Sequence, residues 1–353
     1  MRVLFCVNWK VDQSCTPAQA KDRFSPDYKI PGQPYWFFRH LDPRIEVDIF
    51  DSRVPFGTDD IERKYTKFLI SQGVATYWKS KRYDLVVSHG GQSAMSFALL
   101  QKLFRNKPVP HLLFDIARIT GMSNSSLIKK GCRYALDSLS ATITHSSPQL
   151  SYYKDNFPNI AQHAHFVPLG VDLEEFMPLE TAVEDQILCI GYAKRDWQSL
   201  ISAYERLKTG TKLILLGVQS LPVELPKGVV CIPKVRIAEM REWISRSRFV
   251  VLPLPKLPYC IGQQTLLQTM ALRKTVLAAD IDATRDYITH GQNGFTYRAE
   301  NVDDLEEKLQ YMLSSQANVD VVSGQAYEYA KTHFSEELMA KRIYEICERI
   351  ANA

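Results

Sequence analysis

The sequence lacks the features that mark disulfide-bonded, zinc-bound and membrane-spanning proteins. Its seven cysteines are odd in number and scattered, and none stands in a Cys-x-x-Cys pair, which argues against structural zinc and for a reducing compartment. No apolar run approaches the ~20 residues of a transmembrane helix. The N-terminus enters a predicted strand at once, without the pattern of a signal peptide. We therefore expect a cytoplasmic protein.

The chain also lacks strong charge. Its formal net charge of +4 is far from the basic excess of nucleic-acid-binding proteins, so nucleic acid is not an expected partner. The sequence shows no low-complexity segment and no internal repeat. A hydrophobic content of 45% over 353 residues supports folded cores, and this length predicts two domains.

One stretch, residues 259–279, has a loop–helix–strand pattern around which the rest of the chain is organised. Residues 264–272 are predicted to be helical, and Gln264 and Gln268 lie one turn apart on the same face. Gly262, just before the helix, is typical of a loop that binds an anion at a helix start. An ordinary α/β unit whose glycine only makes a turn fits the spacing equally well.

The first half of the chain alternates short strands with helices, which predicts parallel α/β structure. We expect an irregular segment over residues 9–31, a helix from Gly32 to about residue 41, and a single helix over residues 61–79. His89 and Asp115 stand where two predicted strands end, which is the edge at which open α/β sheets bind ligands. A loop histidine held by backbone groups is the alternative for His89.

A second α/β unit is expected to begin near residue 187. Its first loop contains Gly191, Lys194 and Arg195. Two adjacent cations after a predicted strand are candidates for binding an anionic ligand, whereas the alternative is a pair of exposed charges on a loop. We see no Asp-x-Asp pair at the end of a strand, and this fits chemistry without a metal ion.

The stretch around Gly262 resembles the donor-site signature of retaining GT-B glycosyltransferases of family four, in the branch with a Gly-Gln-x-Thr-Leu-Leu loop. The match runs over residues 266–271 and 274–276. Cys260 and Gln268 stand where the family has two glutamates, Arg273 replaces a glycine and Thr275 a proline. Three further segments resemble the family: the hinge signature over residues 164–178, residues 286–288, and the Gly-x-x-Gly run over residues 291–297.

The resemblance implies a GT-B fold with two doubly wound, Rossmann-like domains facing each other across a cleft. Residues 1–178 would form the acceptor domain and residues 179–333 the nucleotide-sugar domain, and a helix over residues 334–353 would cross back to the first domain. The implied reaction is sugar transfer from a nucleotide-sugar to an acceptor with retention of configuration, with no metal and no cofactor. The acceptor would be a sugar, a lipid-linked molecule or a small molecule.

The resemblance also assigns roles to residues. Lys194 and Arg195 would clamp the diphosphate, and His89 and Asp115 would act on the acceptor side. The remaining donor contacts would come from Gly32, Gly191, Lys234, Val235, Gly262, Gln263, Gln264, Thr265 and Gln268.

Two other functions stay open. Loss of both signature glutamates would suit a non-catalytic binder of nucleotides or sugars, and a nucleotide-sugar epimerase also uses this fold. The epimerase needs several carboxylates in the cleft, and few candidates beyond Asp115 are present. The basic segments 79–82 and 129–133 could contact anionic lipid, so a peripheral position at the inner membrane face is a further expectation.

Overall fold

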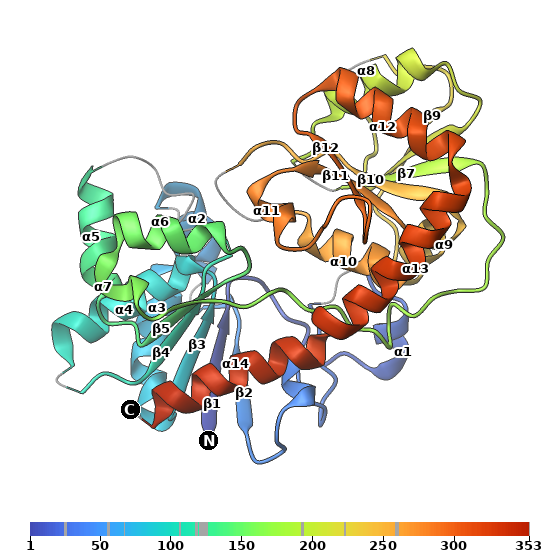
Figure 1. Cartoon of the computed structure of the whole chain (residues 1–353). Coiled ribbons are helices and arrows are strands. Elements are labelled where there is room, and N and C mark those ends of the chain that lie inside the picture. The colour runs from blue at the N-terminus through green and yellow to red at the C-terminus, as the bar shows by residue number, and fades with distance from the viewer. Residues whose placement is uncertain are drawn as a thin grey trace.

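The computed structural model contains two parallel six-stranded sheets in two separate lobes (Figure 1). It describes residues 1–24, 27–54, 57–66, 68–105, 107–116, 119, 126–191, 194–221, 224–257 and 261–352. The strand orders are β2-β1-β3-β4-β5-β6 and β12-β11-β10-β7-β8-β9. Every described strand pair is parallel, as the alternation of strands and helices predicts.

The first sheet is built from the N-terminal half of the chain. Its strands are β1 (Arg2–Val7), β2 (Glu46–Phe50), β3 (Leu85–His89), β4 (His111–Phe114), β5 (Ala141–Thr144) and β6 (Ala164–Phe166). The α-helices are α1 (Pro17–Lys21), α2 (Asp59–Tyr65), α3 (Ile70–Lys79), α4 (Gly91–Phe104), α5 (Ser126–Leu136), α6 (Pro148–Asn156) and α7 (Pro158–Ala161). Two short 3-10 helices are η1 (Trp36–His40) and η3 (Ser80–Arg82).

The second sheet follows in the C-terminal half. Its strands are β7 (Gln186–Ile190), β8 (Lys212–Leu216), β9 (Val229–Ile232), β10 (Phe249–Leu252), β11 (Val276–Asp280) and β12 (Phe295–Arg298). Its helices are α8 (Trp197–Leu207), α9 (Ile237–Arg246), α10 (Gln263–Ala271), α11 (Asp282–Arg285), α12 (Val302–Ser314) and α13 (Gln316–His333), and α14 (Glu336–Ala351) ends the chain. The predicted domain boundaries at residues 178 and 333 stay predictions, and each sheet lies within its expected range.

The central strands are buried along their whole length, because helices cover both faces of each sheet. Strands β3, β4, β5, β7 and β10 contain only buried residues, which is the pattern of a parallel sheet with both faces covered. In each sheet the strand order reverses once, between β1 and β3 and between β7 and β10. Open α/β sheets bind ligands outside the carboxyl ends of the strands at such a reversal, so each domain offers one position for a site.

Helix α14 confirms the expected return of the chain to the first domain. It begins after Ser335, whose hydroxyl accepts a hydrogen bond from the Leu338 amide (3.2 Å). Met339, Ala340 and Ile343 on its inner face belong to the core under the first sheet. Figure 1 shows the helix lying across the first lobe, far from the sheet that precedes it in the chain.

Three local predictions are wrong. Residues 9–31 are not wholly irregular, because α1 forms there behind a capping box between Thr16 and Gln19. Gly32 does not open a helix: the Gln33 amide donates to the Ile30 carbonyl (3.0 Å) in a turn, and only η1 follows. The helix expected over residues 61–79 is divided into α2 and α3.

Candidate functional site

The carboxyl edges of the two sheets face each other. The segment after β5 contacts the segment after β11: the Ser147 amide and hydroxyl donate to the two carboxylate oxygens of Asp286 (2.7 and 2.6 Å). The Ser146 hydroxyl donates to the Asp282 carbonyl (3.1 Å). Residues that follow strands of both sheets are therefore brought to one place between the domains.

Tyr287 holds the same interface from the second domain. Its hydroxyl donates to the His145 carbonyl (2.7 Å) and accepts from the Leu169 amide (3.0 Å). The tyrosine is 1% exposed, so these two bonds are shielded from water. Neither Tyr287 nor His145 was identified as a site residue from the sequence, because the only signal was the position of Tyr287 inside the family-like segment 286–288.

The loop after β7 is the first predicted phosphate contact, and it holds the Arg195 side chain against the end of that strand. The Arg195 Nε donates to the Ile190 carbonyl (3.0 Å), and its Nη1 donates to the Lys194 carbonyl (3.3 Å). A Cβ added to Gly191 would lie 2.6 Å from the Arg195 Cγ, so glycine is required for this side chain to fold back. Burial lowers the pKa of Arg195 below its ordinary value, and a bound anion would offset the cost of burying its charge.

Lys194 differs from its neighbour in exposure and conformation. Its side chain is exposed, and its backbone has φ of 54°, in the left-handed region that non-glycine residues rarely adopt. Such strain is concentrated at ligand-binding loops. Lys194 and Arg195 both follow β7 at the reversal of strand order, where the fold predicts a ligand.

The second predicted phosphate contact, the start of α10, is also at this reversal, after β10. Gly262 is the N-cap residue with φ of 83°, and no side chain caps the helix. An added Cβ would lie 2.8 Å from the Leu254 Cδ1, so both conformation and space favour glycine. The first amide groups of a helix bind anions well. The start of α10 therefore has the local geometry that an anion-binding loop at Gly262 requires.

The three glutamines of α10 have different surroundings. Gln263 is buried and donates from Nε2 to the Ala283 carbonyl (2.9 Å), so its amide fixes α11. Gln264 is exposed, and Gln268 is 8% exposed. Thr265 is half-buried beside them. Their contacts with a donor stay predictions, and Cys260 lies outside the described residues.

The loop after β9, which contains the predicted donor contacts Lys234 and Val235, reaches the first domain. Lys234 is exposed and Val235 half-buried. The next residue, Arg236, forms an ion pair with Asp22, and the Ile237 amide donates to the Arg23 carbonyl (3.0 Å). The segment after β1 therefore spans from the first domain to this loop.

Gly32 lies in an exposed turn with φ of 80°, and a Cβ added there would meet no atom within 4 Å. Its conformation alone explains a glycine at this position. Its predicted contact with the donor stays a prediction.

His89 lies at the reversal of strand order in the first sheet, inside a group of aromatic rings. The ring centres of Trp9 and Trp36 lie 4.9 and 5.2 Å from it, both in edge-to-face geometry, and Phe114 lies 5.5 Å away. Burial, and then His145, lower the pKa of His89 from 6.5 to about 3. The imidazole is therefore neutral at pH 7.

The hydrogen-bonding capacity of His89 is incompletely used. Its Nδ1 is buried and finds no partner among the described residues. Leaving a buried N–H without an acceptor is costly, so we assign the proton to Nε2. Trp9 and Trp36 are both half-buried, and Trp36 has φ of 48°. The sequence indicates His89 but not these two rings. Trp9 follows β1, and Trp36 lies in η1.

Asp115, the second predicted acceptor residue, is tied into the first domain. It is 1% exposed; one carboxylate oxygen accepts from the Ile119 amide (3.1 Å) and the other from the Tyr153 hydroxyl (3.1 Å). The first bond fixes the segment after β4 locally, and the second holds this segment against α6. The predicted contact of Asp115 with an acceptor stays a prediction.

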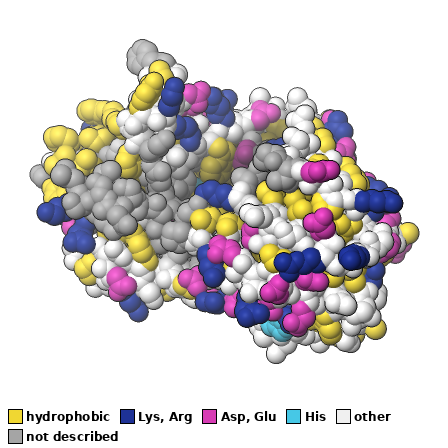
Figure 2. All heavy atoms as spheres, turned by 90° about the horizontal axis from the view of Figure 1, so that it is seen from above, with side chains coloured by type: hydrophobic (Ala, Val, Ile, Leu, Met, Phe, Trp, Pro, Cys, Tyr) yellow, Lys and Arg dark blue, Asp and Glu magenta, His cyan; other side chains and the backbone are white. Residues whose placement is uncertain are grey.

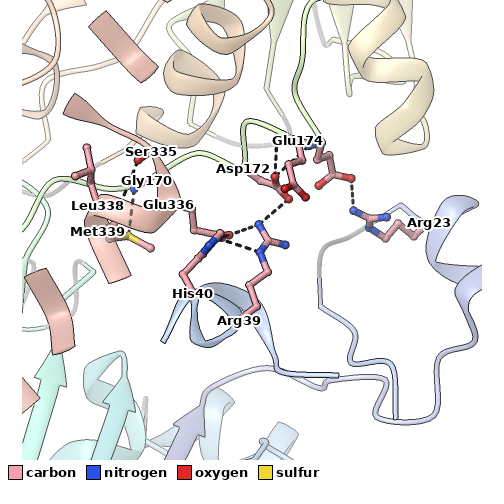
Figure 3. A network of polar contacts seen from close by, with 11 residues as sticks. Arg23, Arg39, His40, Gly170, Asp172, Glu174, Ser335, Glu336, Leu338 and Met339 are labelled. Carbon is pink, nitrogen blue, oxygen red and sulfur yellow. Dashed lines mark hydrogen bonds and ion pairs between the residues drawn. The ribbon is translucent and has the colours of Figure 1, made fainter. Parts of the chain in front are cut away.

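The chain crosses between the domains at two adjacent places, shown in Figure 3. Val171 forms a bridge with Ser335: the Val171 amide donates to the Phe334 carbonyl (2.8 Å), and the Glu336 amide donates to the Val171 carbonyl (3.0 Å). Arg39, from η1, binds the carboxylates of both Asp172 and Glu336.

A metal site is not evident in the described part of the chain, where no group of three or more His, Cys, Asp or Glu side chains could hold an ion. The same part contains no helix long and apolar enough to cross a membrane.

One family model matches part of the chain. Residues 184–315 match the model of the family described as glycosyl transferases group 1. The matched segment contains Arg195, the β9–α9 loop and the start of α10. No curated protein sequence matches the chain.

The fold is that of GT-B proteins of known structure. A glycosyltransferase from Rickettsia africae has a TM-score of 0.72 at 15% identity, covering 99% of this chain and 98% of its own. HepE from Anabaena, solved with UDP, has a TM-score of 0.70 at 15% identity, covering 99% and 100%. Sucrose-phosphate synthase from Thermosynechococcus elongatus has a TM-score of 0.70 at 13% identity, covering 99% of both chains.

Proposed function

We propose that this protein is a glycosyltransferase that moves a sugar from a nucleotide-sugar to an acceptor, with retention of configuration and without a metal ion. The observation that carries the proposal is the match of residues 184–315 to glycosyl transferases group 1, since this segment contains both predicted phosphate contacts. We place the protein in the cytoplasm, with no cofactor. The acceptor is a sugar, a lipid-linked molecule or a small molecule.

The donor diphosphate binds at the reversal of strand order in the second sheet. The Ile190 carbonyl holds Arg195 against the end of β7. The neighbouring strand, β10, is followed by α10, whose first backbone amides are not capped by a side chain. As the sugar bond breaks, negative charge grows on the departing phosphate. Cations and amides that are already in place stabilise that charge without reorganising, so they lower the barrier more than they strengthen substrate binding.

The acceptor binds at the corresponding reversal in the first sheet. His89 stays neutral across the physiological pH range because its pKa is about 3, and its Nε2–H donates a hydrogen bond to an acceptor oxygen. The half-buried rings of Trp9 and Trp36 provide an apolar wall beside it. His89 thus orients the acceptor, and it does not remove its proton.

Retention of configuration is supported by the two candidate bases, His89 and Asp115, because neither is suited to remove a proton from the acceptor. An inverting transfer needs a base that deprotonates the acceptor hydroxyl. The pKa of His89 is too low for this task, and both carboxylate oxygens of Asp115 already accept hydrogen bonds. In a retaining transfer the departing phosphate oxygen takes that proton while the acceptor oxygen bonds to the same face of the sugar carbon.

A panel of nucleotide-sugars tests the proposal. HepE was also solved with UDP-glucose, so uridine nucleotides are the first members to assay. Slow release of free sugar from one donor, with the same rate in EDTA, is the expected result. The anomer of the first product, read by NMR, then decides between retention and inversion.

Two outcomes would favour other functions. An isomerised donor sugar would indicate an epimerase, and tight nucleotide binding with no turnover would indicate a non-catalytic binder. Thermal shift with nucleoside diphosphates separates a misfolded sample from an inactive one, since a ligand at ~100 times its dissociation constant adds about 2.7 kcal/mol.

A further inference from the structure

The first domain exposes an unusual amount of apolar side chain on its outer helices. Ile70, Val74 and Trp78 are spaced four residues apart on α3 and are 44%, 39% and 63% exposed. Residues four apart lie on the same helix face, so these three form one stripe. On α4, Leu103 and Phe104 are 52% and 69% exposed. Exposed apolar side chains gathered in this way mark interaction sites.

These side chains belong to one continuous surface. Helices α3 and α4 pack closely where Gly73 meets Ser96, and the Tyr77 hydroxyl donates to the Phe104 carbonyl (3.3 Å). Lys102 of α4 lies over the ring of Tyr134 on α5, 5.7 Å from its centre. Figure 2 shows hydrophobic side chains gathered at the outer edge of this lobe, with Lys and Arg beside them. We call the exposed faces of α3, η3 and α4, with Tyr134, the basic apolar surface.

The charge of this surface has a single sign. The sequences of α3, η3, α4 and α5 contain no Asp or Glu. Lys79, Lys81 and Arg82 follow the α3 stripe, and the Lys81 ammonium lies 5.0 Å from the centre of the Trp78 ring. The chain as a whole is only mildly basic, at +4, so the absence of acidic residues here is a local property.

We propose that the basic apolar surface docks the protein on a membrane that carries anionic lipids. Apolar side chains enter the boundary between headgroups and acyl chains, tryptophan prefers that boundary, and lysines reach the headgroup phosphates with their stems along apolar atoms. A second copy of this chain is a poorer occupant, because it would bring two basic surfaces together. The proposal does not depend on the sugar transfer and is tested without it.

Vesicle co-sedimentation of the full chain tests the proposal. We expect binding to vesicles of phosphatidylcholine mixed with phosphatidylglycerol, weaker binding to phosphatidylcholine alone, and loss of binding as salt is raised. The double variant Lys79→Glu/Lys81→Glu should partition at least ~25-fold more weakly, given about fivefold for each lysine near an anionic surface. Trp78→Ser/Phe104→Ser should lose binding to both kinds of vesicle.

Matched controls lie on the second domain. Lys227→Glu/Lys331→Glu makes the same charge change at exposed positions, and Val321→Ser removes an apolar side chain that is 61% exposed. Both should bind as the unchanged protein does. Equal binding to neutral and anionic vesicles, equal losses in the controls, or no binding at all would each overturn the proposal. A dimer in solution that dissociates in the Trp78→Ser variant would also overturn the proposal, since the basic apolar surface would then join two copies of the chain.

Discussion

Replacing Tyr287 by phenylalanine removes one oxygen from the interface between the domains. That oxygen donates to the His145 carbonyl and accepts from the Leu169 amide, at 2.7 and 3.0 Å, on a side chain that is 1% exposed. A buried polar group left without a partner costs ~1–3 kcal/mol. Two backbone groups lose their partner in this variant, so we expect Tyr287→Phe to lower stability by about 2–6 kcal/mol.

Tyr297 provides the matched control. It is 2% exposed, and its hydroxyl has no hydrogen-bond partner among the described residues. Tyr297→Phe removes the same atom without breaking a described bond, so its stability should be unchanged or slightly higher. Scanning calorimetry of both variants measures the difference. Equal losses, or a larger loss in Tyr297→Phe, would refute the assignment of Tyr287 as the residue that joins the two domains.

Three further predictions concern the sites. Arg195→Ala and Lys194→Ala should each lower turnover more than stability, because a charge-assisted contact is worth about 1.5–3 kcal/mol; wild-type activity in both would misplace the diphosphate. Gln268→Ala should weaken nucleoside diphosphate binding by roughly 1 kcal/mol in calorimetric titration while Gln268→Glu retains it, and no loss in Gln268→Ala would contradict the predicted donor contact of Gln268. Because burial lowers the pKa of His89 and His111 from 6.5 to about 3, both stay neutral in the folded chain while the unfolded chain gains protons below pH 6.5. Stability should therefore fall by about 2 kcal/mol for each histidine between pH 7 and pH 5, and a His111→Phe variant should show a shallower pH dependence of unfolding.

The sequence predicts those parts of the fold that local pattern decides. The helix after Gly262 was expected over residues 264–272 and forms over Gln263–Ala271. Hydrophobic period and a glycine before the first turn are local signals, so they locate such an element in the sequence. The GT-B architecture followed from the resemblance and is confirmed by the solved structures with the same fold.

The wrong helix predictions have local causes that the hydrophobic pattern does not reveal. Pro34 disfavours a helical Gln33, so η1 begins only after it, at Trp36. Between α2 and α3, the Glu62 carboxylate accepts from the Ser71 amide (3.1 Å), and the Thr66 hydroxyl accepts from the Phe68 amide (3.1 Å). Side chains that bond to backbone in this way compete with helix continuation.

The surroundings of the site depend on residues that are distant in the chain. His89 could be proposed because it ends a strand, but Trp9 lies 80 positions earlier and touches it only because β1 and β3 are neighbours. The contact of Arg236 with Asp22 likewise joins the two domains. No pattern within one segment contains such information, which resides in strand order and in the relative placement of the domains.

The paired crossings of the chain restrict how the two domains can move. A single linker would let one domain swivel about several axes, whereas here residue 171 is hydrogen-bonded on both sides to residues 334 and 336. Two crossings that are fastened side by side act as a hinge: the domains can turn about the line through both crossings, whereas rotation about other axes would pull the crossings apart. Opening about this line would break the bonds that the Ser147 and Tyr287 hydroxyls make across the facing edges, and closing would form them again in the same register.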